Sequence, residues 1–251
     1  MTDDLALAER AARAAGAVLL ERYRGPLRGL GSKSSETDPV SDADREAERV
    51  VRELLEAERP DDGLLAEEGS QSEAASGRRW IVDPLDGTVN YLYGFPAWGV
   101  SVALEDAEGV AVGVVLDPLR DEAFCAVRGG GAELAGEPLR VRERDRLDRA
   151  LVATGFAYLP ERREVQAEVA RRVLPRVRDL RRAGAAALDL AWLAAGRLDA
   201  YYERGLNPWD WAAGRLLVEE AGGKVADLPG EPHGLVAAHP ALLPALRELV
   251  A

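Results

Sequence analysis

The sequence predicts a mixed α/β protein in which layers of helices and sheets pack on one another. Two observations support this fold class. Segments with helical periodicity occur near both ends of the chain, and short apolar runs typical of strands lie between them. Elements that alternate in this way pack around shared apolar faces. We expect two halves, residues 1–146 and 147–251, in one compact unit, because the charged segment 140–149 separates two series of elements.

Length and composition limit the kinds of protein that this chain can be. Its 251 residues, 47% of them apolar, suffice for one large domain or two closely packed ones. We expect no membrane span, because no run of eighteen apolar residues occurs, and no secretory signal, because no basic and then apolar segment opens the chain. The single cysteine, Cys125, excludes an intrachain disulfide, favours a cytoplasmic location and is interpreted as a buried strand thiol.

Two helices are predicted at the start of the first half. The first has an apolar face with steps of three and four residues and ends near Gly25-Pro26. The second begins at Ser41, whose spacing from Asp44 is that of a capping box. Its expected apolar face consists of Ala43, Ala47, Val50 and Leu54. The polar stretch 29–39 between the helices is interpreted as a loop.

Strands dominate the rest of the first half. Residues 80–82 have the character of a buried strand, which we expect to end at Asp83 because Pro84 cannot donate a hydrogen bond to a neighbouring strand. The polar stretch 70–77 is expected to be a loop. Further strands are predicted at residues 64–66, 100–104, 110–116 and 123–127, the second and third forming a hairpin.

The second half shows another alternation of strands and helices. Strands are expected at residues 150–153, 180–182, 198–203, 225–228 and 234–238. Helices are expected at residues 162–177, 185–195, 208–222 and 240–250. Gly222-Gly223 stops the third of these helices, as glycines after a helix commonly do.

The residues with the clearest chemical meaning follow the strand predicted at 80–82. Asp83 and Asp86 are three residues apart, and the hydroxyl of Thr88 follows two residues later. Hard oxygen ligands of this kind suit Mg²⁺ better than zinc or copper. The backbone N–H groups of Gly87 and Thr88, at an expected helix start, suit a phosphate group. Taken alone, these residues are interpreted equally well as two consecutive turns, Asp-Pro and Asp-Gly.

Two further acidic segments favour the metal site over the interpretation as two turns. Glu67-Glu68-Gly69 lies upstream and Trp209-Asp210-Trp211 downstream, each with acids among apolar or small residues, where an unpaired carboxylate would cost several kcal/mol. Together with the stretch 83–90, these segments resemble the inositol monophosphatase family in their order and separation. The resemblance covers nearly the whole chain. It implies a layered αβαβα sandwich, the fold of the sugar phosphatases.

The resemblance also implies an activity: Mg²⁺-dependent hydrolysis of a small phosphate monoester, with myo-inositol monophosphate ranked first. The implied ligands of two or three ions are Glu67, Asp83, the backbone carbonyl of Leu85, Asp86 and Asp210. Asp83 would be shared by two ions, and Glu67 would also serve a weaker third one. Thr88 and its implied partner Asp44 would orient and deprotonate the attacking water.

Other residues are implied to read the substrate or support the site. Glu203 would accept hydrogen bonds from ring hydroxyls, and the small residues Gly184 and Ala186 would let the ring approach the backbone. The residues implied around the phosphate are Asp86, Gly87, Thr88 and Asp210. Glu68 would support the ligands, and Lys33 would point toward the metal site, although the pattern alone places it on a solvated loop.

The charge of the chain bears on its partners. A formal net charge of −12 disfavours general nucleic-acid binding. The glycines at 129–131 are not followed by a helix with a phosphate-binding pattern, which argues against a nucleotide site. We therefore expect a small phosphorylated polyol as partner, with no nucleic acid and no membrane. The resemblance implies a homodimer.

Several alternatives stay open at this point. Within the family they are phosphatases of histidinol phosphate, fructose 1,6-bisphosphate and adenosine 3′,5′-bisphosphate. A haloacid-dehalogenase phosphatase is disfavoured, because its two aspartates are two residues apart, whereas Asp83 and Asp86 are three apart. A calcium-binding loop would need alternating acids that the stretch lacks. A metal-bound scaffold that contacts other proteins would keep every ligand and turn over no substrate.

Overall fold

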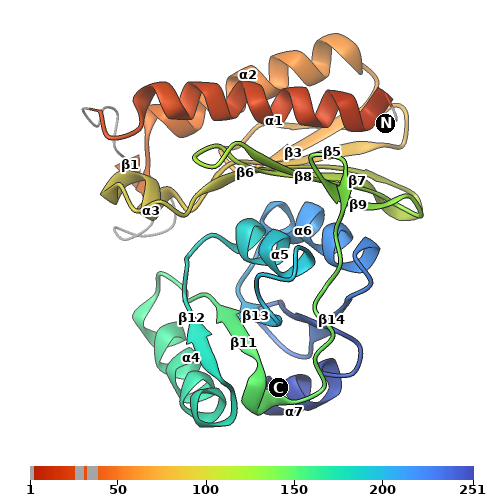
Figure 1. Cartoon of the computed structure of the whole chain (residues 1–251). Coiled ribbons are helices and arrows are strands. Elements are labelled where there is room, and N and C mark those ends of the chain that lie inside the picture. The colour runs from red at the N-terminus through yellow and green to blue at the C-terminus, as the bar shows by residue number, and fades with distance from the viewer. Residues whose placement is uncertain (1–2, 26–30, 33–38) are drawn as a thin grey trace.

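The computed structural model describes residues 3–25, 31–32 and 39–251, whose elements form alternating layers (Figure 1). The helices are α1 (Asp3–Arg22), α2 (Asp42–Glu58), α3 (Thr88–Tyr93), α4 (Pro160–Val173), α5 (Ala186–Ala194), α6 (Pro208–Glu220) and α7 (Leu243–Val250), with short 3-10 turns at Leu147–Arg149 and Leu174–Arg176. From one side to the other, the layers are α1 with α2, an eight-stranded sheet, α5 with α6, a five-stranded sheet, and α4 with α7. The predicted αβαβα sandwich is confirmed.

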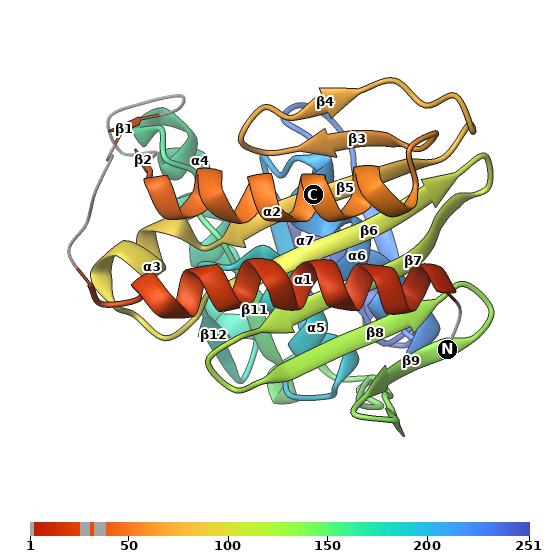
Figure 2. The same ribbon diagram turned by 90° about the horizontal axis from the view of Figure 1, so that it is seen from above.

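The larger sheet separates two apolar cores. Its strands, in spatial order, are β10 (Glu137–Pro138), β9 (Gly131–Leu134), β8 (Glu122–Val127), β7 (Gly109–Asp117), β6 (Gly99–Asp106), β5 (Arg79–Asp86), β3 (Gly63–Ala66) and β4 (Gln71–Ser72). Only β3 and β5 pair in parallel; the other neighbours are antiparallel. Trp80 and Val82 enter the core under α1 and α2, whereas Ile81 enters the core with α5 and α6. In the view from above, α1 and α2 lie side by side over this sheet (Figure 2).

The smaller sheet is also covered on both faces. Its strands, in spatial order, are β12 (Asp179–Arg181), β11 (Leu151–Thr154), β13 (Ala200–Arg204), β15 (Gly234–Ala238) and β14 (Lys224–Leu228). The first three run parallel and the last two pairings are antiparallel. Val152 packs with Leu246 of α7 in the outer core, while Ala153 and Tyr201 share the inner core with Ile81 of the other sheet. One apolar core therefore includes residues of both sheets.

The strand at residues 80–82 does not end where the sequence suggested. We expected Pro84 to stop it at Asp83, but β5 continues to Asp86. The pairing of β5 with β6 shifts between Asp83 and Asp86, so an irregularity leaves Pro84 without the need to donate a hydrogen bond. The strand thereby carries both aspartates of the motif instead of only the first.

Smaller corrections concern the loops and the second helix. Residues 71–72 form β4 inside the stretch 70–77, which was expected to be a loop. In the other expected loop, 29–39, β1 (Gly31–Ser32) pairs with β2 (Pro39–Val40), which begins at its last residue. Helix α2 buries Val51 and Leu55, whereas the predicted Val50 and Leu54 are only partly buried, although Leu54 packs against the core. The reason is that α2 also turns two acids inward, as described below, and its buried face is rotated accordingly. Lys33 lies outside the described residues.

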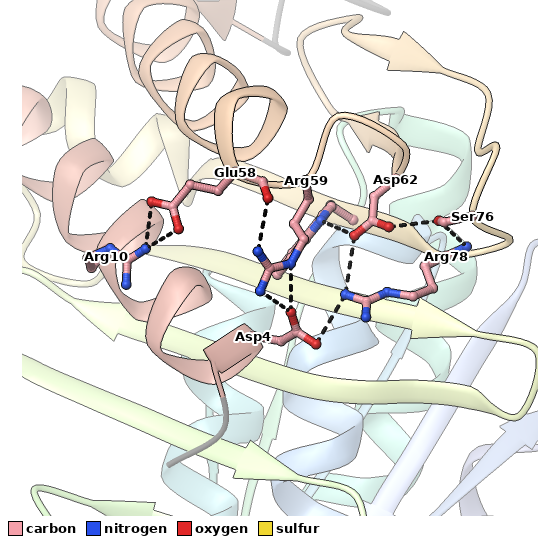
Figure 3. Close-up of polar contacts among 8 residues, drawn as sticks. Asp4, Arg10, Glu58, Arg59, Asp62, Ser76 and Arg78 are labelled. Carbon is pink, nitrogen blue, oxygen red and sulfur yellow. Dashed lines mark hydrogen bonds and ion pairs between the residues drawn. The ribbon is translucent and has the colours of Figure 1, made fainter.

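An ion-pair network joins the beginning of α1 to the end of α2 (Figure 3). Arg59 and Arg78 both contact the carboxylate of Asp4, at 2.9 and 3.1 Å, and Arg78 also reaches Asp62 at 3.2 Å. Arg10 of α1 pairs with Glu58 of α2 at 2.6 Å.

Within residues 3–25, 31–32 and 39–251, no helix has both the length and the apolar character that crossing a membrane requires. Cys125 is buried, as expected, and burial raises the pKa of its thiol to about 12.

Candidate active site

Side chains from both halves of the chain meet around one cavity of about 350 Å³. The residues predicted for the site that line it are Glu67, Asp83, Leu85, Asp86, Gly87, Thr88, Gly184, Ala186, Glu203 and Asp210. They lie at or beside the ends of β3, β5 and β13 and the starts of α3, α5 and α6. The structure thus brings residues from six elements to one place, and their individual roles stay predictions.

The turn between β5 and α3 holds the two aspartates of the motif. Asp83 and Asp86 are buried, with 2% and 8% of their surface exposed. Asp83 Oδ1 accepts a hydrogen bond from the backbone N–H of Leu85 at 3.0 Å. Gly87 caps α3 with a φ of 88°, and a Cβ there would lie 3.0 Å from the carbonyl oxygen of Ala97. Both the conformation and the space at this turn therefore require glycine.

Asp86 ties this turn to α5, a hundred residues further along the chain. Its carboxylate accepts hydrogen bonds from the backbone N–H groups of Ala186 at 3.2 Å and Ala187 at 2.8 Å. These amides open the helix, where a negative charge is stabilised. Because Asp86 already engages the Ala186 amide, Ala186 offers the cavity its small side chain.

Asp44 connects α2 to the threonine of the motif. The Thr88 hydroxyl lies 3.1 Å from Asp44 Oδ1 and 3.2 Å from the carbonyl oxygen of Leu85, and it can donate its one proton to either. The Asp44 carboxylate also accepts the N–H of Ser41 at 3.0 Å and the Ser41 hydroxyl, which closes the predicted capping box. Asp44 is fully buried, and Thr88 links it to the cavity wall.

Burial, together with neighbouring acids, raises the pKa of several carboxyl groups around the cavity. Removal from water, and then the neighbouring Glu67, raise the pKa of Asp83 and of Asp210 well above the usual range. Removal from water raises the pKa of Asp86 to about 7, although the Ala187 N–H opposes this shift. A divalent cation among these groups would favour their ionised forms and so relieve the crowding.

The donor chemistry of this wall fits Mg²⁺. Glu67, Asp83, Asp86 and Asp210 all face the cavity. Within the described part of the chain, no three or more Asp, Glu, His or Cys side chains lie close enough together to hold a metal ion as they stand. The fit therefore rests on the type of donor, carboxylate oxygen, and on the mutual repulsion of acids that a hard cation would offset.

Glu203 faces the same cavity from the end of β13. The hydroxyl of Tyr201 donates a hydrogen bond to Glu203 Oε2 at 2.5 Å. Removal from water raises the pKa of Glu203 to about 7, and this hydrogen bond opposes the shift. A Cβ at position 155 would overlap the Glu203 carboxylate, so this position of the carboxylate requires glycine at 155.

Several residues at or near the cavity were not anticipated from the sequence. Gly155, Arg162 and Arg182 line it. Asp189 of α5 is only 1% exposed, and its Oδ1 has no hydrogen-bond partner among the described residues. Removal from water raises the pKa of Asp189 well above the usual range. An acid inside the apolar run 185–195 was an available signal for Asp189, because burying a carboxylate is costly.

Glu68 and Lys33 contribute differently from the lining residues. Among the described residues, Glu68 is not part of the cavity wall; it borders a separate polar depression with Glu48 and Arg52. Its backbone N–H donates to the Glu48 carboxylate at 2.6 Å. The supporting roles of Glu68 and Lys33 stay predictions, since Lys33 lies outside the described residues.

Comparison with known proteins relates this arrangement to a family. The model of the inositol monophosphatase family matches residues 1–251. The inositol-1-monophosphatase of Rhizobium meliloti (strain 1021) is 44% identical over 247 residues, which cover 92% of this chain and 90% of the relative. Nus factor SuhB of Xylella fastidiosa is 45% identical over 223 residues, which cover 88% of this chain and 80% of the relative. The crystal structure of extragenic suppressor protein suhB from Bartonella henselae is similar with a TM-score of 0.93 and 38% identity, covering 99% of this chain and 98% of that one.

The layered sandwich is also the fold of the inositol monophosphatase from Anabaena (Nostoc) sp. PCC 7120, whose structure is similar with a TM-score of 0.82 and 37% identity, covering 98% of this chain and 93% of that one. Within this fold, the full-length match and the identities above define the position of the chain. It belongs to the inositol monophosphatase family, as the motifs around Glu67, Asp83 and Asp210 predicted.

Proposed function

We propose that the protein is a Mg²⁺-dependent phosphatase that hydrolyses a small phosphate monoester by direct attack of water. The observation that carries this proposal is the hydrogen bond between Thr88 and the buried Asp44, at the edge of a cavity walled by the acids of the motif. Membership in the inositol monophosphatase family supports it.

The acids that would hold the cations are divided between two positions. Glu67, Asp83 and the Leu85 carbonyl would hold one ion. Asp83, Asp86 and Asp210 would hold a second. When bound, such ions supply positive charge to the phosphate and leaving group and lower the pKa of a coordinated water. The need is large, because uncatalysed hydrolysis of phosphate monoesters is among the slowest reactions known, with enhancements up to about 10²¹.

The chain's own groups orient the attacking water. When the Thr88 hydroxyl donates a hydrogen bond to Asp44, its oxygen can accept a hydrogen bond from a water in the cavity. As this water attacks, its proton would pass to Thr88 while the proton of Thr88 passes to Asp44. Asp44 is held by two donors from Ser41, so the acceptor for Thr88 is fixed in place. The N–H groups of Gly87 and Thr88 would hold a phosphate oxygen beside this water.

The substrate we rank first is myo-inositol monophosphate. Glu203 would accept hydrogen bonds from ring hydroxyls, and Gly184 and Ala186 would let the ring lie close to the backbone. Histidinol phosphate is ranked second, because a carboxylate also suits a cationic amine. Fructose 1,6-bisphosphate stays an alternative, and adenosine 3′,5′-bisphosphate is ranked last because a purine would need an apolar shelf. We also propose a homodimer in the cytoplasm.

A second candidate, a role as a Nus factor, is favoured by the name of the Xylella fastidiosa relative. This role corresponds to the non-catalytic scaffold considered above. If it holds, the prediction that the protein has no nucleic-acid partner stays undecided.

The experiment that tests the proposal is a phosphate-release assay with a panel of monoesters, in Mg²⁺ and in EDTA. We expect turnover that requires Mg²⁺ and is fastest with inositol phosphate. Faster turnover of histidinol phosphate would overturn the ranking. If no ester is turned over in Mg²⁺, the proposal of phosphatase activity is wrong, and the scaffold role remains as the alternative.

A further inference from the structure

A second buried acid on α2 lies one turn beyond Asp44. Glu48 is only 5% exposed, although a glutamate on a helix is ordinarily a surface residue. Its Oε2 accepts the backbone N–H of Glu68 at 2.6 Å, and its Oε1 accepts the backbone N–H of Ser70 at 3.0 Å. Both oxygens of one buried carboxylate are thus engaged by the same short stretch of chain.

That stretch is the turn that follows β3 and carries Glu67. Its start is held by two backbone hydrogen bonds, from Glu67 to the Val82 carbonyl at 3.2 Å and from Ala66 to the Ser70 carbonyl at 2.9 Å. Gly69 within it has a φ of 110°, a conformation that β-carbon-bearing residues rarely adopt. The N–H groups of residues 68 and 70 therefore depend on Glu48, and charge-assisted bonds of this kind are stronger than those between neutral groups.

Asp44 and Glu48 are four residues apart and both face inward from α2. Asp44 accepts the hydroxyl of Thr88, and Glu48 accepts the amides directly after Glu67. One face of one helix thus holds both the threonine and the turn that the proposed chemistry requires. This arrangement also explains why Val51 and Leu55, which continue the same face, are the apolar residues of α2 that enter the core.

We propose that Glu48 is a positioning residue: it fixes the turn 67–70 so that the Glu67 carboxylate meets the other acids of the cavity at the distance a shared cation needs. Glu48 itself is not among the described residues that line the cavity, so it would act through the turn. The inference rests on the proposed function only in the identity of the cation. Residues that orient metal ligands typically change metal affinity or activity by about 10–100-fold when they are replaced.

The test compares Glu48→Gln with Glu53→Gln. Glutamine has nearly the shape of glutamate, but its amide NH₂ group would face one of the two backbone donors. Glu53 lies on the exposed side of the same helix, where it pairs only with Arg49 in the described part of the chain, so its replacement is the matched control. If Glu48→Gln does not fold, Glu48→Asp keeps the charge while its shorter stem withdraws it from the turn.

Three measurements are made on each full-length variant. In Glu48→Gln, amide hydrogen exchange of residues 66–72 should be faster by about tenfold, equivalent to about 1.4 kcal/mol. The Mg²⁺ concentration for half-maximal activity should rise about tenfold, with kcat at saturating Mg²⁺ largely kept. A given Mg²⁺ concentration should also raise the Tm of this variant less than that of the parent protein. Glu53→Gln should leave all three unchanged.

The outcomes separate the possible readings. Unchanged exchange and unchanged Mg²⁺ dependence in Glu48→Gln would overturn the inference. So would a lower Tm in EDTA with no change in the Mg²⁺ response, because Glu48 would then only stabilise the fold. If the parent protein hydrolyses no phosphate ester, the proposed function fails, while exchange and the Mg²⁺-dependent Tm still decide the role of Glu48.

Discussion

The Glu203 carboxylate occupies the space that any side chain at position 155 would need. Gly155 directly follows β11, and Glu203 lies near the end of β13, the parallel neighbour of that strand. The Tyr201 hydroxyl donates a hydrogen bond to the same carboxylate. Gly155 and Tyr201 therefore together determine the position of the Glu203 carboxylate, the group proposed to recognise the substrate.

Replacing Gly155 tests this relationship. Gly155→Ala should displace Glu203 and lower kcat/KM for inositol phosphate by about 10–100-fold, since a hydrogen bond to a charged group is worth about 1.5–3 kcal/mol. The control is the same replacement in a Glu203→Ala background, where no carboxylate is left to displace. Steady-state kinetics should show almost no further loss there, and fully additive losses would show that Gly155 acts elsewhere.

Glu203→Ala tests whether the carboxylate reads the substrate. We expect a loss of about 10–100-fold in kcat/KM for inositol phosphate, because ring hydroxyls lose a charged acceptor. Glycerol 2-phosphate has fewer hydroxyls and should lose less. Equal losses for the two esters, measured side by side, would argue that Glu203 supports the site without reading the alcohol.

Thr88→Ala tests the activation of water. Removing the hydroxyl that links the cavity to Asp44 should lower kcat by about 10² or more, with a smaller effect on KM because the backbone amides remain. Hydrolysis by the parent protein in ¹⁸O-labelled water should place the label directly in phosphate. A phosphorylated Asp83, trapped and found by mass spectrometry, would favour the haloacid-dehalogenase chemistry instead.

The raised carboxyl pKa values predict an unusual pH dependence for the metal-free protein. Asp86 and Glu203 have pKa values of about 7, above the value of about 4 expected when unfolded. Between these values the folded chain binds more protons than the unfolded chain, so stability falls as pH rises. In EDTA, Tm should therefore decrease from about pH 5 to pH 8. Saturating Mg²⁺ should counter this decrease, and a Tm in EDTA that rises over the same range would contradict the account.

Much of the fold could be predicted from apolar periodicity, because most strands and helices bury one regular face. The failures have local causes. Pro84 was expected to end a strand, but an irregularity in β5 accommodates it, and only the partner strand reveals that shift. The apolar face predicted for α2 was wrong at Val50 and Leu54, because the helix also buries Asp44 and Glu48, which accept hydrogen bonds from groups distant in sequence.

The meeting of Glu67, Asp83 and Asp210 around one cavity could be predicted from residue type and order, whereas their roles stay predictions. The part of the site that depends on the absence of a side chain could not be predicted. Nothing in the sequence distinguishes Gly155 from other loop glycines, because its role depends on Glu203 approaching from another strand. The two backbone N–H groups that Glu48 accepts are equally invisible in the sequence, since every residue but proline carries one.

We propose that the acids of the cavity bind the cations that make hydrolysis possible, and the replacement Asp83→Asn tests this binding most directly. Phosphate release should require Mg²⁺ in the parent protein and be abolished in the variant. The Tm of the variant in EDTA should be equal or higher, because one of several repelling carboxyl groups is gone. Full activity of the parent protein in EDTA, or a fully active Asp83→Asn variant, would contradict the account.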